Sequence, residues 1–466
     1  MNQVIALAGN APARLRSFVT LAEMKALALL ALPMTGVALV NMGMSITDTV
    51  MMGWIGPTAL AAGAVVSDLY SIVYYFMVGI LSAVSPLIAH ALGANRKDDV
   101  RRSMRQGFVA AVLLAGPAAL AVVHAGDLLA VFGVERAVID LGSGYALMMA
   151  LTIIPMMFVA VWRNAFAALG RPRVFLAAIA LALPANALAN YVLMFGFGPI
   201  PAMGLTGAGL ASALVAWCLV LGFAGFAAVN KDMRAYRLFQ RWWRIDRAGL
   251  EEVFRLGLPI GFSSIGEVGV FLISTVIISL FGTEALAAQA ITIRMAGVVY
   301  AVTVGLSQAA TVRVGYAAGQ NNDLAIREAV WTAMTAGIVC GIAIFAGLAA
   351  VVDILPWMFL DGSSHAAGDV AVYAGGLLFL LGVLNLVQVP GVAATAVLRG
   401  FKETRAPMAL CLTGYWLIGM PAGYVAAFPM GLGAQGIWMG LVTGVAATAV
   451  LMCLRLAHRH GRALWA

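Results

Sequence analysis

The sequence is poor in charged residues and in cysteine. Only 10% of its 466 residues are Asp, Glu, Lys or Arg, whereas soluble domains carry about 25%. With 63% hydrophobic residues, such a chain is not an ordinary soluble domain, and we interpret it as a multi-pass membrane protein. The four cysteines lie in or beside apolar runs without C-x-x-C spacing, which favours buried thiols over a metal centre or disulfides.

Catalytic motifs are missing as well. The sequence contains no G-x-x-x-x-G-K-[ST] phosphate-binding loop and no H-E-x-x-H zinc motif, and its five histidines do not cluster. A membrane-embedded prenyl transferase needs paired Asp-rich motifs, but Asp98-Asp99 is the only aspartate doublet and lies in a basic loop. We therefore expect neither an enzyme, nor a transition-metal centre, nor a cofactor. Without an ATP-binding site, we expect any transport by this membrane protein to be driven by an ion gradient.

Twelve apolar runs are long enough to cross a bilayer as helices. All but two of the 28 Lys and Arg residues, Arg136 and Arg294, fall on one side when alternate connections are counted. The positive-inside rule then places both termini and the long middle loop in the cytoplasm. The basic residues behind the net charge of +8 thus set the membrane topology, and they imply no nucleic-acid partner. The runs lie near residues 25–54, 59–91, 105–125, 140–168, 174–196, 205–229, 252–282, 285–317, 328–351, 370–397, 408–428 and 432–456.

The sequence repeats itself at an offset of 226 residues. Pro33 falls on Pro259, and Gly56 falls on Gly282, with Ala-Leu-Ala-Ala beginning three positions after each glycine. Each half holds six spans, so the halves share an orientation and are related by an axis along the membrane normal. We predict an all-α membrane protein with twelve transmembrane helices in two pseudo-symmetric six-helix lobes around a central cleft. The predicted parts are a cytoplasmic lead-in (1–24), an N-terminal lobe (25–229), a cytoplasmic interfacial linker (230–251), a C-terminal lobe (252–456) and a cytoplasmic tail (457–466).

The first span carries a single acid, Asp48. Asn41 and Ser45 lie on the same helix face as Asp48, and Asn186 and Asn190 on the fifth span are one turn apart and can reach it. A carboxylate at this depth can exchange a proton or, with further oxygen ligands, hold Na⁺. The alternative is a permanently protonated aspartate that only stabilises the helix packing.

Glu267 is the corresponding acid of the seventh span. It lies near the middle of a 27-residue apolar stretch, where a carboxylate costs about 2.5–3.5 kcal/mol to insert. We predict an ion site here too, with a neutral, hydrogen-bonded glutamate as the alternative. Serines on the same stripe are Ser263, Ser264 and Ser274, and the candidate partners in the second lobe are Asn385, Gln388, Gln289 and Tyr415.

Asp68 and Arg294 are separated by the repeat offset and therefore occupy equivalent positions in the two halves. Symmetry-related positions near the axis face one another, so we predict an ion pair across the cleft between the lobes, a gate that helps close its periplasmic side. The alternative is that each finds partners within its own lobe. Residues expected to line a substrate cleft are Asn41, Met44, Tyr70, Gln289, Asn385 and Tyr415.

Several motifs together resemble the multidrug and toxic compound extrusion (MATE) transporters, in their NorM-like bacterial branch. The resemblance covers nearly the whole chain. Its motifs are Leu32-Pro33-Met34, Asp48-Thr-Val-Met-Met-Gly, Gly257-Leu-Pro-Ile, Arg313-Val-Gly-Tyr, Leu398-Arg-Gly-Phe-Lys-Glu-Thr-Arg and Tyr415-Trp-x-x-Gly-x-Pro-x-Gly-Tyr.

The resemblance implies export of cationic, amphipathic compounds in exchange for Na⁺ or H⁺. It also implies that Asp48, Asn186 and Asn190 form the coupling site of the first lobe and that Glu267 belongs to a cation site in the second. Many relatives have an aspartate at the position of Asn190. The chain departs from the family at Gln388, where an aspartate is usual, so the second-lobe site has lost one of its two carboxylates.

These observations and the resemblance predict a monomeric secondary antiporter of a bacterial plasma (inner) membrane that exports cationic or amphipathic drugs or metabolites by alternating access. Coupling through Asp48 or through Glu267, and to Na⁺ or to H⁺, remain open alternatives. A flippase for a lipid-linked precursor is the alternative with the same architecture. It would favour a cleft rich in basic residues, where only Arg294 qualifies.

Overall fold

The computed structural model describes residues 19–124, 126–127, 130, 133, 135–238, 240, 244–360 and 365–465. The part of the chain it describes is all-helical, with no strand, and twelve of its helical segments are long and apolar enough to span a membrane. The predicted fold class is therefore confirmed. The helices are α2 (Leu21–Ile55), α3 (Pro57–Leu81), α4 (Val84–Gly93), α5 (Lys97–Val123), α7 (Arg136–Ala168), α8 (Pro172–Phe195), α9 (Gly204–Val229), α10 (Lys231–Arg234), α11 (Arg247–Ile278), η1 (Ser279–Phe281), α12 (Thr283–Gly319), α13 (Asp323–Val351), η2 (Leu355–Met358), α14 (His365–Gly400), α15 (Arg405–Leu412), η3 (Thr413–Gly419), α16 (Met420–Ala427) and α17 (Gly433–Trp465).

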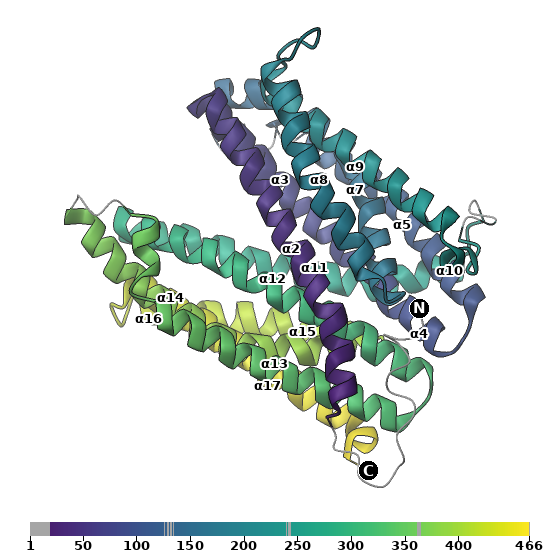
Figure 1. Ribbon diagram of the computed structural model, residues 1–466. Coiled ribbons are helices and arrows are strands. Elements are labelled where there is room, and N and C mark those ends of the chain that lie inside the picture. The colour runs from purple at the N-terminus through teal and green to yellow at the C-terminus, as the bar shows by residue number, and fades with distance from the viewer. Residues whose placement is uncertain are drawn as a thin grey trace. The chain divides into compact units, whose positions relative to one another are not determined.

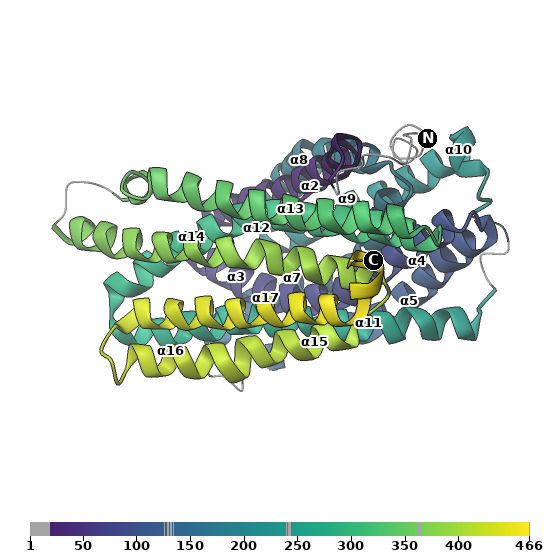
Figure 2. The same ribbon diagram turned by 90° about the horizontal axis from the view of Figure 1, so that it is seen from below.

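The helices form two compact units (Figure 1). The first unit comprises residues 36–261, and the second comprises residues 262–465 together with the described chain before Gly36. In the first unit α9 packs against α7 and α8. In the second, α14 packs against α12, α13 and α17 (Figure 2). The units divide within α2 and within α11, close to Pro33 and Pro259, so each of these proline-containing helices contributes to both units.

The predicted connecting segments are only partly described. Residues 1–18 of the lead-in, and 239 and 241–243 of the linker, including Trp242 and Trp243, lie outside the described residues. The described part of the linker contains the four-residue helix α10, and α11 begins at Arg247, which places residues 247–251 in a helix. Helix α17 likewise continues through the predicted tail to Trp465. The predicted lobe boundaries themselves stay a prediction.

The backbone repeats with the same period as the sequence. Asn95 and Asn321 are 226 residues apart, and both adopt left-handed conformations, with φ of 55° and 53°. Gly56 and Gly282 precede α3 and α12 with φ of 147° and 104°. Asparagine and glycine are the residues that tolerate positive φ most readily, so the repeat preserves backbone geometry as well as composition.

The packing of α16 against α17 depends on glycine. A β-carbon at Gly440 would overlap the backbone of Gly423 and lie 2.6 Å from the carbonyl oxygen of Gly419. Small residues at such interfaces let two transmembrane backbones approach closely. The neighbouring core is large and aromatic, with Trp438 fully buried beside Phe271.

We expect Gly440→Ala to lower the free energy of unfolding by about 1–3 kcal/mol, because its methyl group forces the two helices apart. The matched control is Gly222→Ala in α9, where a β-carbon meets no atom within 4 Å. That variant should be as stable as the parent protein or up to about 1 kcal/mol more stable, because alanine favours a helix over glycine. Reversible denaturation in mixed micelles measures both values, and equal stability of the two variants would contradict the packing argument.

Candidate functional site

The first candidate site joins α2 to α8 within the first unit. Asn190 Nδ2 donates a hydrogen bond of 2.6 Å to Asp48 Oδ1 and lies 3.3 Å from Asn186 Oδ1. Both asparagines are buried, at 1% and 0% exposure, whereas Asp48 is half-buried. The structure thus confirms the predicted contact of Asp48 with Asn190, and Asn186 joins the cluster through Asn190. The one-turn spacing of Asn186 and Asn190 puts both amides on the same face of α8.

Two polar atoms of this cluster have no hydrogen-bond partner among the described residues. They are the amide nitrogen of Asn186 and the amide oxygen of Asn190, and both are buried. An unsatisfied buried polar group costs about 1–3 kcal/mol. A carboxylate beside a spare donor and a spare acceptor makes a polar site that can hold a proton, a water molecule or a small cation.

The other predicted residues of the first unit lie on α2 and α3. Asn41 and Ser45 are exposed on α2, and Met44 is half-buried. Tyr70 is buried and stacks on Tyr74, with ring centroids 5.7 Å apart. Their suggested role in lining a substrate cleft stays a prediction.

The second candidate site is centred on Glu267 of α11 in the second unit. Gln388 Nε2 of α14 donates a hydrogen bond of 3.1 Å to Glu267 Oε1, and the Tyr300 hydroxyl of α12 lies 3.5 Å from Glu267 Oε2. The contact with Gln388 was predicted. Tyr300 was missed: the repeat offset aligns it with Tyr74, but no feature of the sequence links it to Glu267. Both carboxylate oxygens therefore face neutral donors.

The structure places two of the other predicted partners of Glu267 elsewhere. Gln289 is buried, donates to Thr275 at 3.0 Å and accepts from the Trp438 indole at 2.8 Å, so both ends of its amide are used in the core. Asn385 donates to the carbonyl of Leu381, one turn back on its own helix. The expectation that these amides pair with Glu267 is corrected accordingly, since Gln289 bonds to α11 and α17 and Asn385 donates within α14.

The remaining predicted site residues differ in how far they are buried. Tyr415 is buried in the π-helical segment η3, and Ser274 is buried with its hydroxyl 3.9 Å from the sulfur of Met420. Ser263 is buried and Ser264 half-buried. Asp68 is exposed on α3 and Arg294 is exposed on α12. Their pairing as a gate stays a prediction.

The comparisons with known proteins agree on one family. The MatE family model matches residues 33–192 and 259–425, one match in each half. The "Probable multidrug resistance protein NorM" of Agrobacterium fabrum is 35% identical over 436 residues, which cover 92% of this chain and 93% of the relative. The protein of that name from Pseudomonas aeruginosa is 34% identical over 446 residues, covering 96% and 91%.

Solved structures share the fold at lower identity. The crystal structure of the eukaryotic MATE transporter AtDTX14 superposes with a TM-score of 0.83 at 22% identity and covers 95% of this chain and 98% of that one. A crystal structure of a MATE protein in the bent conformation gives a TM-score of 0.85 at 19% identity, with 95% and 96% covered.

Proposed function

Because the chain belongs to the MatE family, we propose that it is an antiporter that exports small organic cations or amphipathic compounds in exchange for protons. Membership makes it a multi-pass membrane transporter and not an enzyme. The multidrug resistance for which the relatives are named supports a cargo of varied chemical structure. The basic connections support insertion in a plasma membrane with both termini in the cytoplasm.

The observation that carries the proposal is the short contact between Asp48 and Asn190. The amide of Asn190 presents an N–H donor to the carboxylate, whereas a cation site for Na⁺ needs converging oxygen acceptors. A donor stabilises the ionised carboxylate, and protonation of Asp48 weakens that contact. Protonation and deprotonation of Asp48 therefore weaken and strengthen the hydrogen bond that links α2 to α8. We propose this change as the coupling step.

Glu267 has a different proposed role. Its carboxylate accepts from Gln388 and lies beside Tyr300, whose side chain is 44% exposed. A negative charge next to an accessible aromatic ring suits an organic cation, which binds both to the charge and to the ring face. We therefore assign substrate recognition to Glu267 and ion coupling to Asp48. Coupling then requires that proton and substrate affinities be reciprocally linked.

The test is efflux of a fluorescent organic cation from proteoliposomes under two separate gradients. We expect an imposed pH gradient to drive efflux and an imposed Na⁺ gradient of equal size to leave it at the level of protein-free vesicles. Efflux under the Na⁺ gradient alone would overturn proton coupling. Efflux that neither gradient accelerates would overturn the antiport mechanism itself.

A further inference from the structure

A basic cavity of about 490 Å³ lies on the first unit, away from Asp48. It is formed by the first turns of α5 and by the segment that leads into α11. Five arginines line it against three aspartates. The arginines are Arg101, Arg102, Arg105, Arg244 and Arg247, and the aspartates are Asp98, Asp99 and Asp246.

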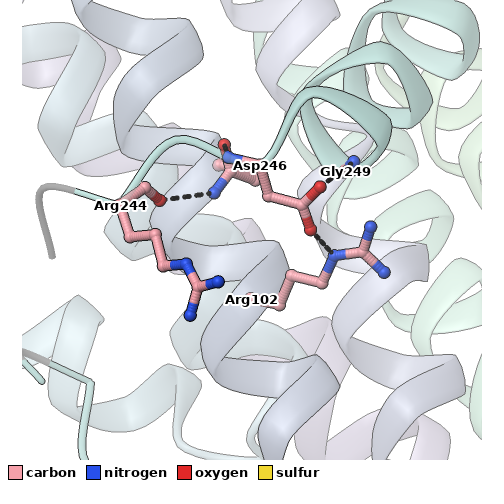
Figure 3. Close-up of polar contacts among 5 residues, drawn as sticks. Arg102, Arg244, Asp246 and Gly249 are labelled. Carbon is pink, nitrogen blue, oxygen red and sulfur yellow. Dashed lines mark hydrogen bonds and ion pairs between the residues drawn. The ribbon is translucent and has the colours of Figure 1, made fainter. Parts of the chain in front are cut away.

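A buried glutamine holds the wall of this cavity in place. Gln106 is 0% exposed, donates to the carbonyl oxygen of Arg244 at 3.3 Å and accepts from the backbone N–H of Asp246 at 3.3 Å. The Arg102 guanidinium pairs with the Asp246 carboxylate, which also accepts from the backbone N–H of Gly249 at 3.4 Å (Figure 3). The same guanidinium holds the pKa of Asp246 below its usual range. The segment before α11 is thus fixed to α5.

The positive charge of the cavity is only partly neutralised. Arg102 is paired with Asp246, and Arg101 contacts Asp98 at 2.8 Å. Arg244 and Arg247 are exposed and form no ion pair with any residue that the structure describes. Figure 3 shows the Arg244 guanidinium pointing away from the Asp246 carboxylate. Two guanidinium groups therefore remain available to a ligand.

The cavity lies at the depth in the membrane where the headgroup of a lipid would lie. The charged first turns of α5 end at Gln106, and residues 107–123 contain no charge. In α11 the charged residues of the first turns end at Arg255, and Glu267 is the one charged residue of the apolar stretch that follows. The arginines therefore lie where a transmembrane helix leaves the hydrocarbon, which is the level of lipid phosphates.

We propose that this cavity binds a phosphate group, with Arg244 and Arg247 as its principal ligands. Planar guanidinium groups bind phosphate oxygens in a bidentate manner, and Arg is preferred over Lys where that geometry matters. A phosphodiester of an anionic lipid and free inorganic phosphate share this chemistry. A bound phosphate would lie between α5 and the start of α11, the helix that carries Glu267.

The experiment measures binding to the full-length protein in a non-ionic detergent by calorimetric titration. The probes are short-chain phosphatidylglycerol, short-chain phosphatidylcholine and inorganic phosphate. We expect the double variant Arg244→Gln/Arg247→Gln to bind the preferred anionic probe about 30-fold more weakly, because each arginine near an anionic group contributes about a fivefold factor. Phosphatidylcholine should bind neither protein measurably.

The matched control is Arg173→Gln/Arg234→Gln, which removes two exposed arginines of the same unit that do not line the cavity. It should bind as the parent protein does. Preference for phosphatidylglycerol over phosphate identifies a lipid, and equal binding of phosphate identifies a free anion. Absence of binding by the parent protein, equal binding of phosphatidylcholine, or an equal loss in the control overturns the proposal. If the double variant does not fold, Arg247→Gln alone should lose about fivefold.

Discussion

Asp48→Asn is expected to reduce gradient-driven efflux by about 10- to 100-fold while the protein still folds and inserts. Coupling between two ligands is typically worth a factor of that size. The substitution preserves the size of the side chain but removes the only group of the α2–α8 cluster that can gain and lose a proton. Asn190 still has an oxygen to which it can donate, so the contact between α2 and α8 persists but no longer responds to a proton. Efflux from proteoliposomes under an imposed pH gradient measures the loss.

Asp140→Asn is the matched control for this prediction. It makes the same chemical change on an exposed residue of α7 in the same unit, and efflux should not change. Glu267→Gln provides the second comparison, because under our assignment it weakens binding of the organic cation and leaves proton uptake intact. Parental efflux from Asp48→Asn would exclude this carboxylate from coupling. An equal loss of proton uptake in Glu267→Gln would show that the two acids share the task.

The second large effect concerns a buried ion pair that joins the start of α2 to α12 in the second unit. Glu23 and Arg313 are 2% and 6% exposed. Arg313 Nε donates to Glu23 Oε1 at 2.7 Å, and a second guanidinium nitrogen contacts the other carboxylate oxygen. Glu23→Ala should lower the free energy of unfolding by about 3–5 kcal/mol, because it leaves a buried guanidinium without its counter-charge. Denaturation in mixed micelles measures the difference.

Two further variants make this prediction specific. Glu403→Ala removes the acid from the pair with Arg455, whose side chains are 17% and 35% exposed, and this more accessible pair should cost about 1 kcal/mol or less. Glu23→Leu/Arg313→Leu removes both charges and should recover most of the lost stability, because an apolar pair of similar volume replaces a buried ion pair at little cost. Similar losses in Glu23→Ala and Glu403→Ala would contradict the argument.

The candidate site of the first unit was largely predictable from the sequence. Asn186 and Asn190 are one helical turn apart, and each acid stands alone in its apolar stretch, so local spacing identified both the acids and the amide pair. Gln388 was one of four candidate partners of Glu267, and the family resemblance singled it out as the position where an aspartate is usual. The partners that the sequence did not predict correctly, Gln289 and Asn385, are amides that any of several neighbours could satisfy.

The sequence by itself determined the twelve spans, the two matching halves and the two acids at the centre of the proposed mechanism. Hydropathy, spacing and repetition are properties of short stretches, and they survive without knowledge of how the helices pack. Only the tertiary structure decided which side chains meet. Glu23 and Arg313 are 290 residues apart, and the arginines of the phosphate cavity come from α5 and from the distant start of α11. Such contacts depend on the rotation and vertical offset of one helix against another. These are fixed by close packing, as at Gly440, and not by composition.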